Sequence, residues 1–61
     1  MKTYEPMKGE YVSETAKRMV ALAKKTNGTV TAKFNDIALT ANPGDKADAI
    51  VKYYETKSQE S

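Results

Sequence analysis

Residues 31–41, with the sequence TAKFNDIALTA, decide how this chain folds. Apolar residues alternate with polar or small ones on both sides of Asn35-Asp36, which is the pattern of two strands joined by a tight turn. A two-residue loop places Phe34 opposite Ile37 and extends the match to two further apolar pairs, Ala32 with Leu39 and Val30 with Ala41. A register shift of one residue would destroy this match, so the sequence predicts one hairpin with one apolar face.

The hairpin raises two questions, about its turn and about its edges. Asn35 suits the first position of a type I′ turn, whereas Asp36 occupies the position where glycine is favoured. We expect the flanking Phe34 and Ile37 to be buried. A two-stranded sheet has two free edges, which natural proteins usually protect. We therefore expect one edge to be covered, either by residues 4–7 of the N-terminal arm or by a second copy of the chain.

A helix is predicted before the hairpin, over residues 13–26. Ser13 is a favourable N-cap residue, and Asn27-Gly28 supplies the left-handed conformation that commonly ends a helix. Between these signals the apolar residues recur with the spacing of one helix face: Ala16, Met19, Val20 and Ala23. The pattern indicates an amphipathic helix that covers the apolar face of the hairpin.

A second helix is predicted after the hairpin, over residues 45–57. Asn42-Pro43-Gly44 breaks the second strand, and Asp45 is expected to cap the helix, with Asp48 in a capping-box position. Its apolar stripe has the same helical period: Ala47, Ile50, Val51 and Tyr54. This helix also has an apolar face to bury against the hairpin.

The predicted fold is a small α+β domain of two layers in the order αββα, with a two-stranded antiparallel hairpin packed against two helices. We expect an irregular or flexible N-terminal arm over residues 1–11, one domain over residues 12–57 and a frayed tail over residues 58–61. The strands are expected at residues 29–34 and 37–41. A chain of 61 residues buries only roughly 60% of its unfolded surface, so little stability is held in reserve.

The composition argues against catalysis. The chain has no cysteine and no histidine, so a zinc site would need carboxylates alone, and general acid–base catalysis would need a strongly shifted Glu, Asp or Lys. We expect no catalytic, metal or cofactor site. No apolar run approaches the roughly 18 residues of a membrane span, and residues 1–6 lack the apolar core of a signal peptide. The expected location is the cytoplasm.

Two sets of residues are candidates for contacts with partners. Exposed cations of the first helix and the hairpin are candidate nucleic-acid contacts: Lys17, Arg18, Lys24, Lys25 and Lys33. Tyrosines outside the apolar stripes are candidate protein contacts: Tyr4, Tyr11 and Tyr53. The net charge of +2 is too small to favour nucleic acid by itself. Convergence of the five cations on one surface free of carboxylates would favour nucleic acid.

The stretch from Ala21 to Glu55 resembles short, mostly uncharacterised phage and prophage accessory proteins. The resemblance lies in a helix ending Lys-x-Asn-Gly, a Phe-Asn-x-Ile-x-Leu hairpin, a Pro-Gly-Asp turn and a helix that carries a tyrosine pair. These motifs are structural and transfer no site residues. The resemblance implies a small protein of the bacterial host cytoplasm that binds a host or viral protein. Nucleic-acid binding by the first helix is the alternative, and a homodimer through a hairpin edge is a further expectation.

Overall fold

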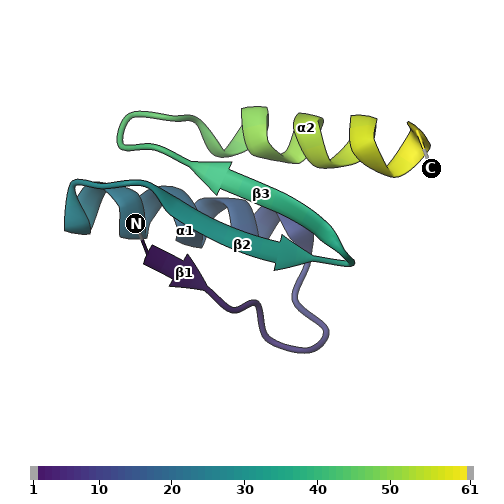
Figure 1. Cartoon of the computed structure of the whole chain (residues 1–61), viewed down its shortest axis with the longest axis horizontal. Coiled ribbons are helices and arrows are strands. Elements are labelled where there is room, and N and C mark those ends of the chain that lie inside the picture. The colour runs from purple at the N-terminus through teal and green to yellow at the C-terminus, as the bar shows by residue number, and fades with distance from the viewer. Residues whose placement is uncertain (1, 61) are drawn as a thin grey trace.

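The computed structural model describes residues 2–60, which form three strands and two helices. In chain order these are β1 (Lys2–Tyr4), α1 (Val12–Thr26), β2 (Val30–Phe34), β3 (Ile37–Ala41) and α2 (Ala47–Glu60), as Figure 1 shows. Both predicted helices and both predicted strands are present, so the expected small α+β domain is confirmed. The order is βαββα rather than αββα, because a strand precedes the first helix.

The hairpin has the predicted register. β2 and β3 are antiparallel, with Phe34 opposite Ile37, and the two further apolar pairs are Ala32 with Leu39 and Val30 with Ala41. Asn35 and Asp36 have φ angles of 48° and 67°. Positive φ at both central residues is the signature of a type I′ turn, whose twist matches that of the flanking strands.

The prediction of a two-stranded sheet is wrong, because the N-terminal segment supplies a third strand. β1 lies parallel to β2, in the sheet order β1-β2-β3, and the backbone N–H of Lys2 donates to the carbonyl of Thr29 at 2.9 Å. Parallel neighbours need a long crossover connection, and α1 provides it. The sequence left two ways to cover an edge, the N-terminal arm or a second copy of the chain. In the structure the arm covers the edge of β2, through Lys2–Tyr4.

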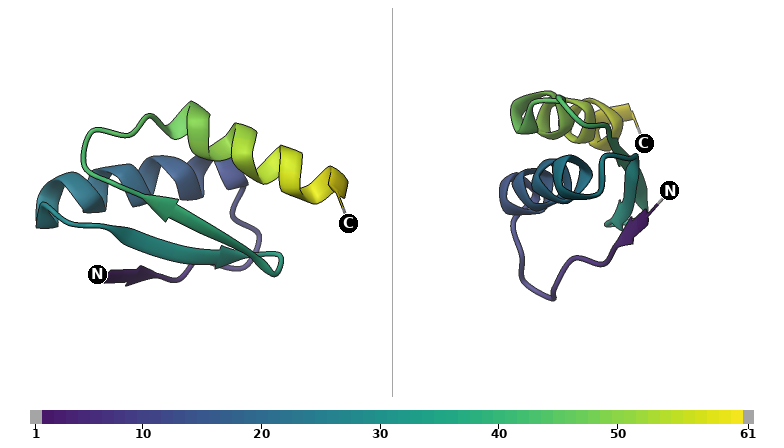
Figure 2. Two further views of the ribbon diagram at one scale, coloured as in Figure 1. Left: turned by 45° about the horizontal axis from the view of Figure 1, so that its top comes forward. Right: turned by 90° about the vertical axis from the view of Figure 1, so that its left-hand side faces the viewer.

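Both helices lie on the same side of the sheet, as the end-on view in Figure 2 shows. The fully or almost fully buried apolar residues between these layers come from both helices and from β2 and β3: Ala16, Met19, Val20, Ala23, Val30, Ala32, Leu39, Ala41 and Ile50. The predicted stripe of α1 is therefore buried in full. In the stripe of α2, Ile50 is buried and Ala47, Val51 and Tyr54 are partly buried against the core.

Phe34 and Ile37 are only half-buried, contrary to expectation, because they flank the turn at the end of the sheet. Contacts with Tyr54 of α2 compensate in part for this incomplete burial. Its ring meets that of Phe34 edge-to-face, with centroids 5.3 Å apart, and its hydroxyl accepts a hydrogen bond from Asn35 Nδ2 at 2.9 Å. The turn is therefore tied to α2 by one apolar and one polar contact.

The predicted N-caps are wrong at both helices. α1 begins at Val12, so Ser13 lies inside it, and the carbonyl of Tyr11 accepts the first backbone hydrogen bonds, from Glu14 and Thr15 at 3.0 Å each. The C-terminal end is as predicted, with Asn27 in the left-handed conformation at φ 53°. The loop that leads into α1 therefore fixes where the helix begins.

The second helix begins at Ala47, two residues later than predicted. Asp45 closes the preceding turn instead: its carboxylate accepts the N–H of Asn42 at 2.8 Å, and its own N–H donates to the Asn42 carbonyl at 3.0 Å. This turn positions Gly44, at φ 93°, where a side chain would be strained. α2 continues to Glu60, through most of the expected tail, and Ser61 lies outside the described residues, as does Met1.

Replacing Asp36 by glycine is expected to stabilise the protein by a few tenths to about 1 kcal/mol, since φ at this residue is 67° and glycine adopts such angles without steric cost. The free energy of unfolding in urea measures the effect. Asp36→Asn, which removes the charge and retains tolerance of positive φ, should change little. A glycine variant less stable than the original chain would contradict the strain argument.

Candidate functional site

The free edge of β3 is the first candidate site. In a hairpin with a two-residue turn, hydrogen bonds join Phe34 to Ile37 and then every second pair, so the N–H and C=O groups of Ala38 and Thr40 point away from β2. Neither residue takes part in the backbone hydrogen bonds that the described residues make outside helices and strands. Residues 37–41 also carry no charge and no proline, so this edge lacks the usual protection.

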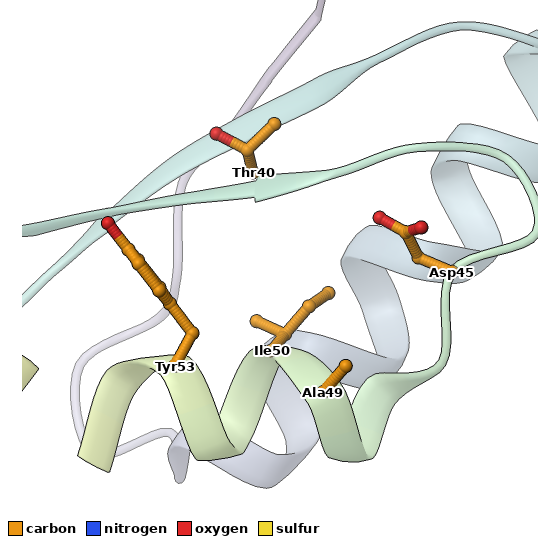
Figure 3. Close-up of a pocket in the computed structure, with 5 residues that line it drawn as sticks. All are labelled: Thr40, Asp45, Ala49, Ile50 and Tyr53. Carbon is orange, nitrogen blue, oxygen red and sulfur yellow. The ribbon is translucent and has the colours of Figure 1, made fainter. Parts of the chain in front are cut away.

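α2 forms a wall beside this edge. Ala49, Ile50 and Tyr53 extend from the helix toward β3, as Figure 3 shows. Together with Thr40 and Asp45 they line a groove of about 400 Å³, which we call the β3–α2 groove. The groove has an apolar floor at Ile50 and a carboxylate at one end, at Asp45.

Tyr53 stands at the other end of the β3–α2 groove, and 43% of it is exposed. The ammonium group of Lys57 lies 5.8 Å from the centre of its ring, within the range of a cation–π contact. Of the three tyrosines that the sequence suggested as protein contacts, Tyr53 is therefore the one that lines this groove. The signal in the sequence was its position one residue before Tyr54, which belongs to the apolar stripe of the helix.

The second feature is a polar cluster around Glu10. Its carboxylate accepts hydrogen bonds from the Tyr4 hydroxyl at 2.9 and 3.0 Å, from Thr15 Oγ1 at 2.5 Å and from the Met7 N–H at 3.4 Å, while Arg18 Nε lies 3.8 Å away. The Glu10 side chain is only 4% exposed, and Thr15 is fully buried. The cluster joins β1, the loop that follows it and α1.

The cluster is suited to holding the structure together. The Thr15 hydrogen bond lowers the pKa of Glu10 most; the bonds from Tyr4 and Met7 and the charge of Arg18 add to this effect, and burial opposes it. Burial and then the Glu10 hydrogen bond raise the pKa of Tyr4. A carboxylate with a lowered pKa whose oxygens are already bonded is a poor general base. Tyr4, one of the three tyrosines that the sequence suggested as protein contacts, is half-buried, and its hydroxyl is bonded within this cluster.

The five cations suggested as nucleic-acid contacts do not converge on one surface. Four of them lie exposed along α1: Lys17, Arg18, Lys24 and Lys25. Lys33 alternates with Ala32 and Phe34 along β2, and those two face the helices, so Lys33 lies on the opposite face of the sheet. In addition, Arg18 lies beside Glu10. The condition that would favour nucleic acid is therefore not met.

The third feature lies in the loop between β1 and α1, within the segment whose sequence predicts an irregular or flexible arm. Met7 is 69% exposed and Tyr11 is 74% exposed. They line a hollow of about 480 Å³, which we call the loop surface. The end of β2 and the β2–β3 turn complete its lining through Lys33, Phe34 and Asn35. Sequence patterns identified Tyr11 as a candidate contact but gave no reason to join it to the hairpin.

Among the side chains that the structure describes, no group of three or more carboxylates is placed to hold a metal ion. Neither α1 nor α2 combines the length and the apolar composition that a membrane span needs. Comparison with protein-family models, with curated proteins and with solved structures found no match to this chain.

Replacing Glu10 by glutamine should lower the free energy of unfolding at neutral pH. It should also make that free energy less dependent on pH in the acidic range. The pKa of Glu10 is lowered in the folded state, so its contribution is present above the unfolded pKa and is lost as pH falls through the folded pKa. Urea unfolding at pH 7 and at pH 3 should therefore show a large difference between the two proteins at pH 7 and a smaller one at pH 3. Glu14→Gln, at an exposed position of α1, is the matched control. Equal differences at both pH values would contradict this role.

Proposed function

We propose that this chain is a small non-enzymatic protein that acts by binding another protein, and that it binds an extended segment along the free edge of β3. The observation that carries the proposal is the uncharged, unpaired edge at Ala38 and Thr40, with α2 as a wall beside it. Strand addition of this kind supplies affinity through backbone hydrogen bonds and specificity through pockets for alternate side chains.

The β3–α2 groove also defines the chemistry of the segment. Alternate side chains of an added strand point to the same side, so they enter the groove at every second position. The floor at Ile50 and Ala49 accepts one apolar side chain, and Tyr53 packs against it from one end. Asp45 favours a basic residue at the other end. The proposed ligand is therefore an extended segment with apolar residues at alternate positions and a lysine or arginine near its end.

The proposed setting is a phage or prophage accessory protein in the cytoplasm of a bacterial host cell. It rests on the resemblance of residues 21–55 to such proteins, and the partner is accordingly a host or viral protein. Nucleic-acid binding is not proposed, because Lys33 is separated from the cations of α1 by the thickness of the sheet and Arg18 lies beside a carboxylate.

Ala38→Pro is expected to weaken binding of strand-forming peptides by about tenfold or more. Proline removes the outward N–H and obstructs the edge, and one or two hydrogen bonds of about 0.5–1.5 kcal/mol each are lost. The bonds between β3 and β2 do not use this N–H, so the fold should persist. The measurement is the affinity of peptides selected against the chain from a displayed library of random ten-residue sequences.

Ala38→Val, which retains the N–H at the same exposed position, is the matched control and should bind within about twofold of the original chain. In bacterial cells that carry a phage or prophage, the partner is the protein captured by the original chain and by Ala38→Val but not by Ala38→Pro. Peptides that bind Ala38→Pro equally well, or a library without binders, would contradict the proposal. A homodimer in sedimentation that Ala38→Pro dissociates would show that a second copy occupies the edge.

A further inference from the structure

The loop surface is separate from the β3–α2 groove and shares no lining residue with it. Figures 1 and 2 place the loop after β1 and the turn between β2 and β3 at the same end of the molecule. Among the described residues, the two largest exposed fractions of bulky apolar side chains, those of Met7 and Tyr11, are found here. Tyrosine and methionine are enriched in protein interfaces, where they supply contact area.

The described lining of the loop surface carries two lysines and one carboxylate. Lys8 and Lys33 are exposed at its border. Glu10 is the one carboxylate among the described lining residues, and its oxygens are bonded to Tyr4 and Thr15 on the inner side, with Arg18 close by. The two lysines therefore face solvent without a competing carboxylate among the described lining residues.

The Glu10 cluster holds this surface in place before any partner arrives. The backbone N–H of Glu10 donates to the Met7 carbonyl at 3.0 Å, and the Met7 N–H donates to the Glu10 carboxylate at 3.4 Å. Gly9 accommodates the turn between them, with φ at 85°. A loop fixed by its own hydrogen bonds loses less conformational entropy on binding than a flexible one.

We infer that the loop surface binds an acidic segment of a protein that carries one large apolar anchor residue. The anchor packs between Met7 and Tyr11, and carboxylates on either side of it pair with Lys8 and Lys33. Buried apolar anchors with charges at the border are the usual composition of a binding hot spot. A nucleic acid fits less well, because two lysines neutralise few phosphates.

The test uses a fluorescent nine-residue peptide with one central tryptophan flanked by four acidic residues on each side. Its counterpart has lysine in place of every acidic residue. The original chain should bind the acidic peptide and not the basic one. Binding should shift the NMR signals of the Met7 methyl group and the Tyr11 ring. Met7→Ser combined with Tyr11→Ser, and Lys8→Glu combined with Lys33→Glu, should each weaken binding by about tenfold or more.

The matched controls lie elsewhere on the surface: Tyr53→Ser removes an exposed aromatic ring of the β3–α2 groove, and Lys24→Glu reverses an exposed charge of α1. Both should retain the acidic peptide, as should Ala38→Pro, so failure of this inference is distinguishable from failure of strand addition. The inference is overturned if the acidic peptide does not bind, or if the controls weaken it as much as the loop variants. It is also overturned if a single-stranded oligonucleotide of twelve nucleotides binds the loop surface more tightly than the acidic peptide does. All variants replace exposed residues, and unchanged melting curves verify their folds.

Discussion

The register of β2 against β3 is the constraint on which the rest of the structure depends. It places every second residue of both strands on one face, so a single apolar surface meets both helices. A two-residue loop fixes this register, and the loop in turn requires Asn35 and Asp36 to adopt positive φ angles. Local strain at two exposed residues therefore accompanies the register that gives this protein of only 61 residues a continuous core.

The third strand depends on polar contacts more than on apolar ones. β1 has three residues, and its link to α1 passes through the hydrogen bonds that Tyr4 and Thr15 make to the Glu10 carboxylate. An ionised carboxylate in a nearly buried position is tolerated because several donors replace its water. The same arrangement that attaches β1 also shapes the loop that displays Met7 and Tyr11.

The two edges of the sheet differ, and the proposed function rests on that difference. The β1 edge is short, begins with Lys2 and is followed closely by Pro6, and these features discourage the addition of another strand. The β3 edge has five residues without charge or proline and lies beside a groove. An edge of this kind that was not used for binding would be a risk of aggregation.

The sequence by itself determined the hairpin, its turn and the helices with their buried stripes, because these depend on periodicity and on contacts between near neighbours. It also indicated that Tyr53 is partly exposed. Only the tertiary structure decided the role of residues 2–4, the starts of both helices and the location of the grooves. A three-residue strand has too little pattern to recognise, and its stability comes from pairing with residues 30–32, far along the chain. For the same reason the two candidate surfaces join residues distant in sequence, and no local pattern could bring them together.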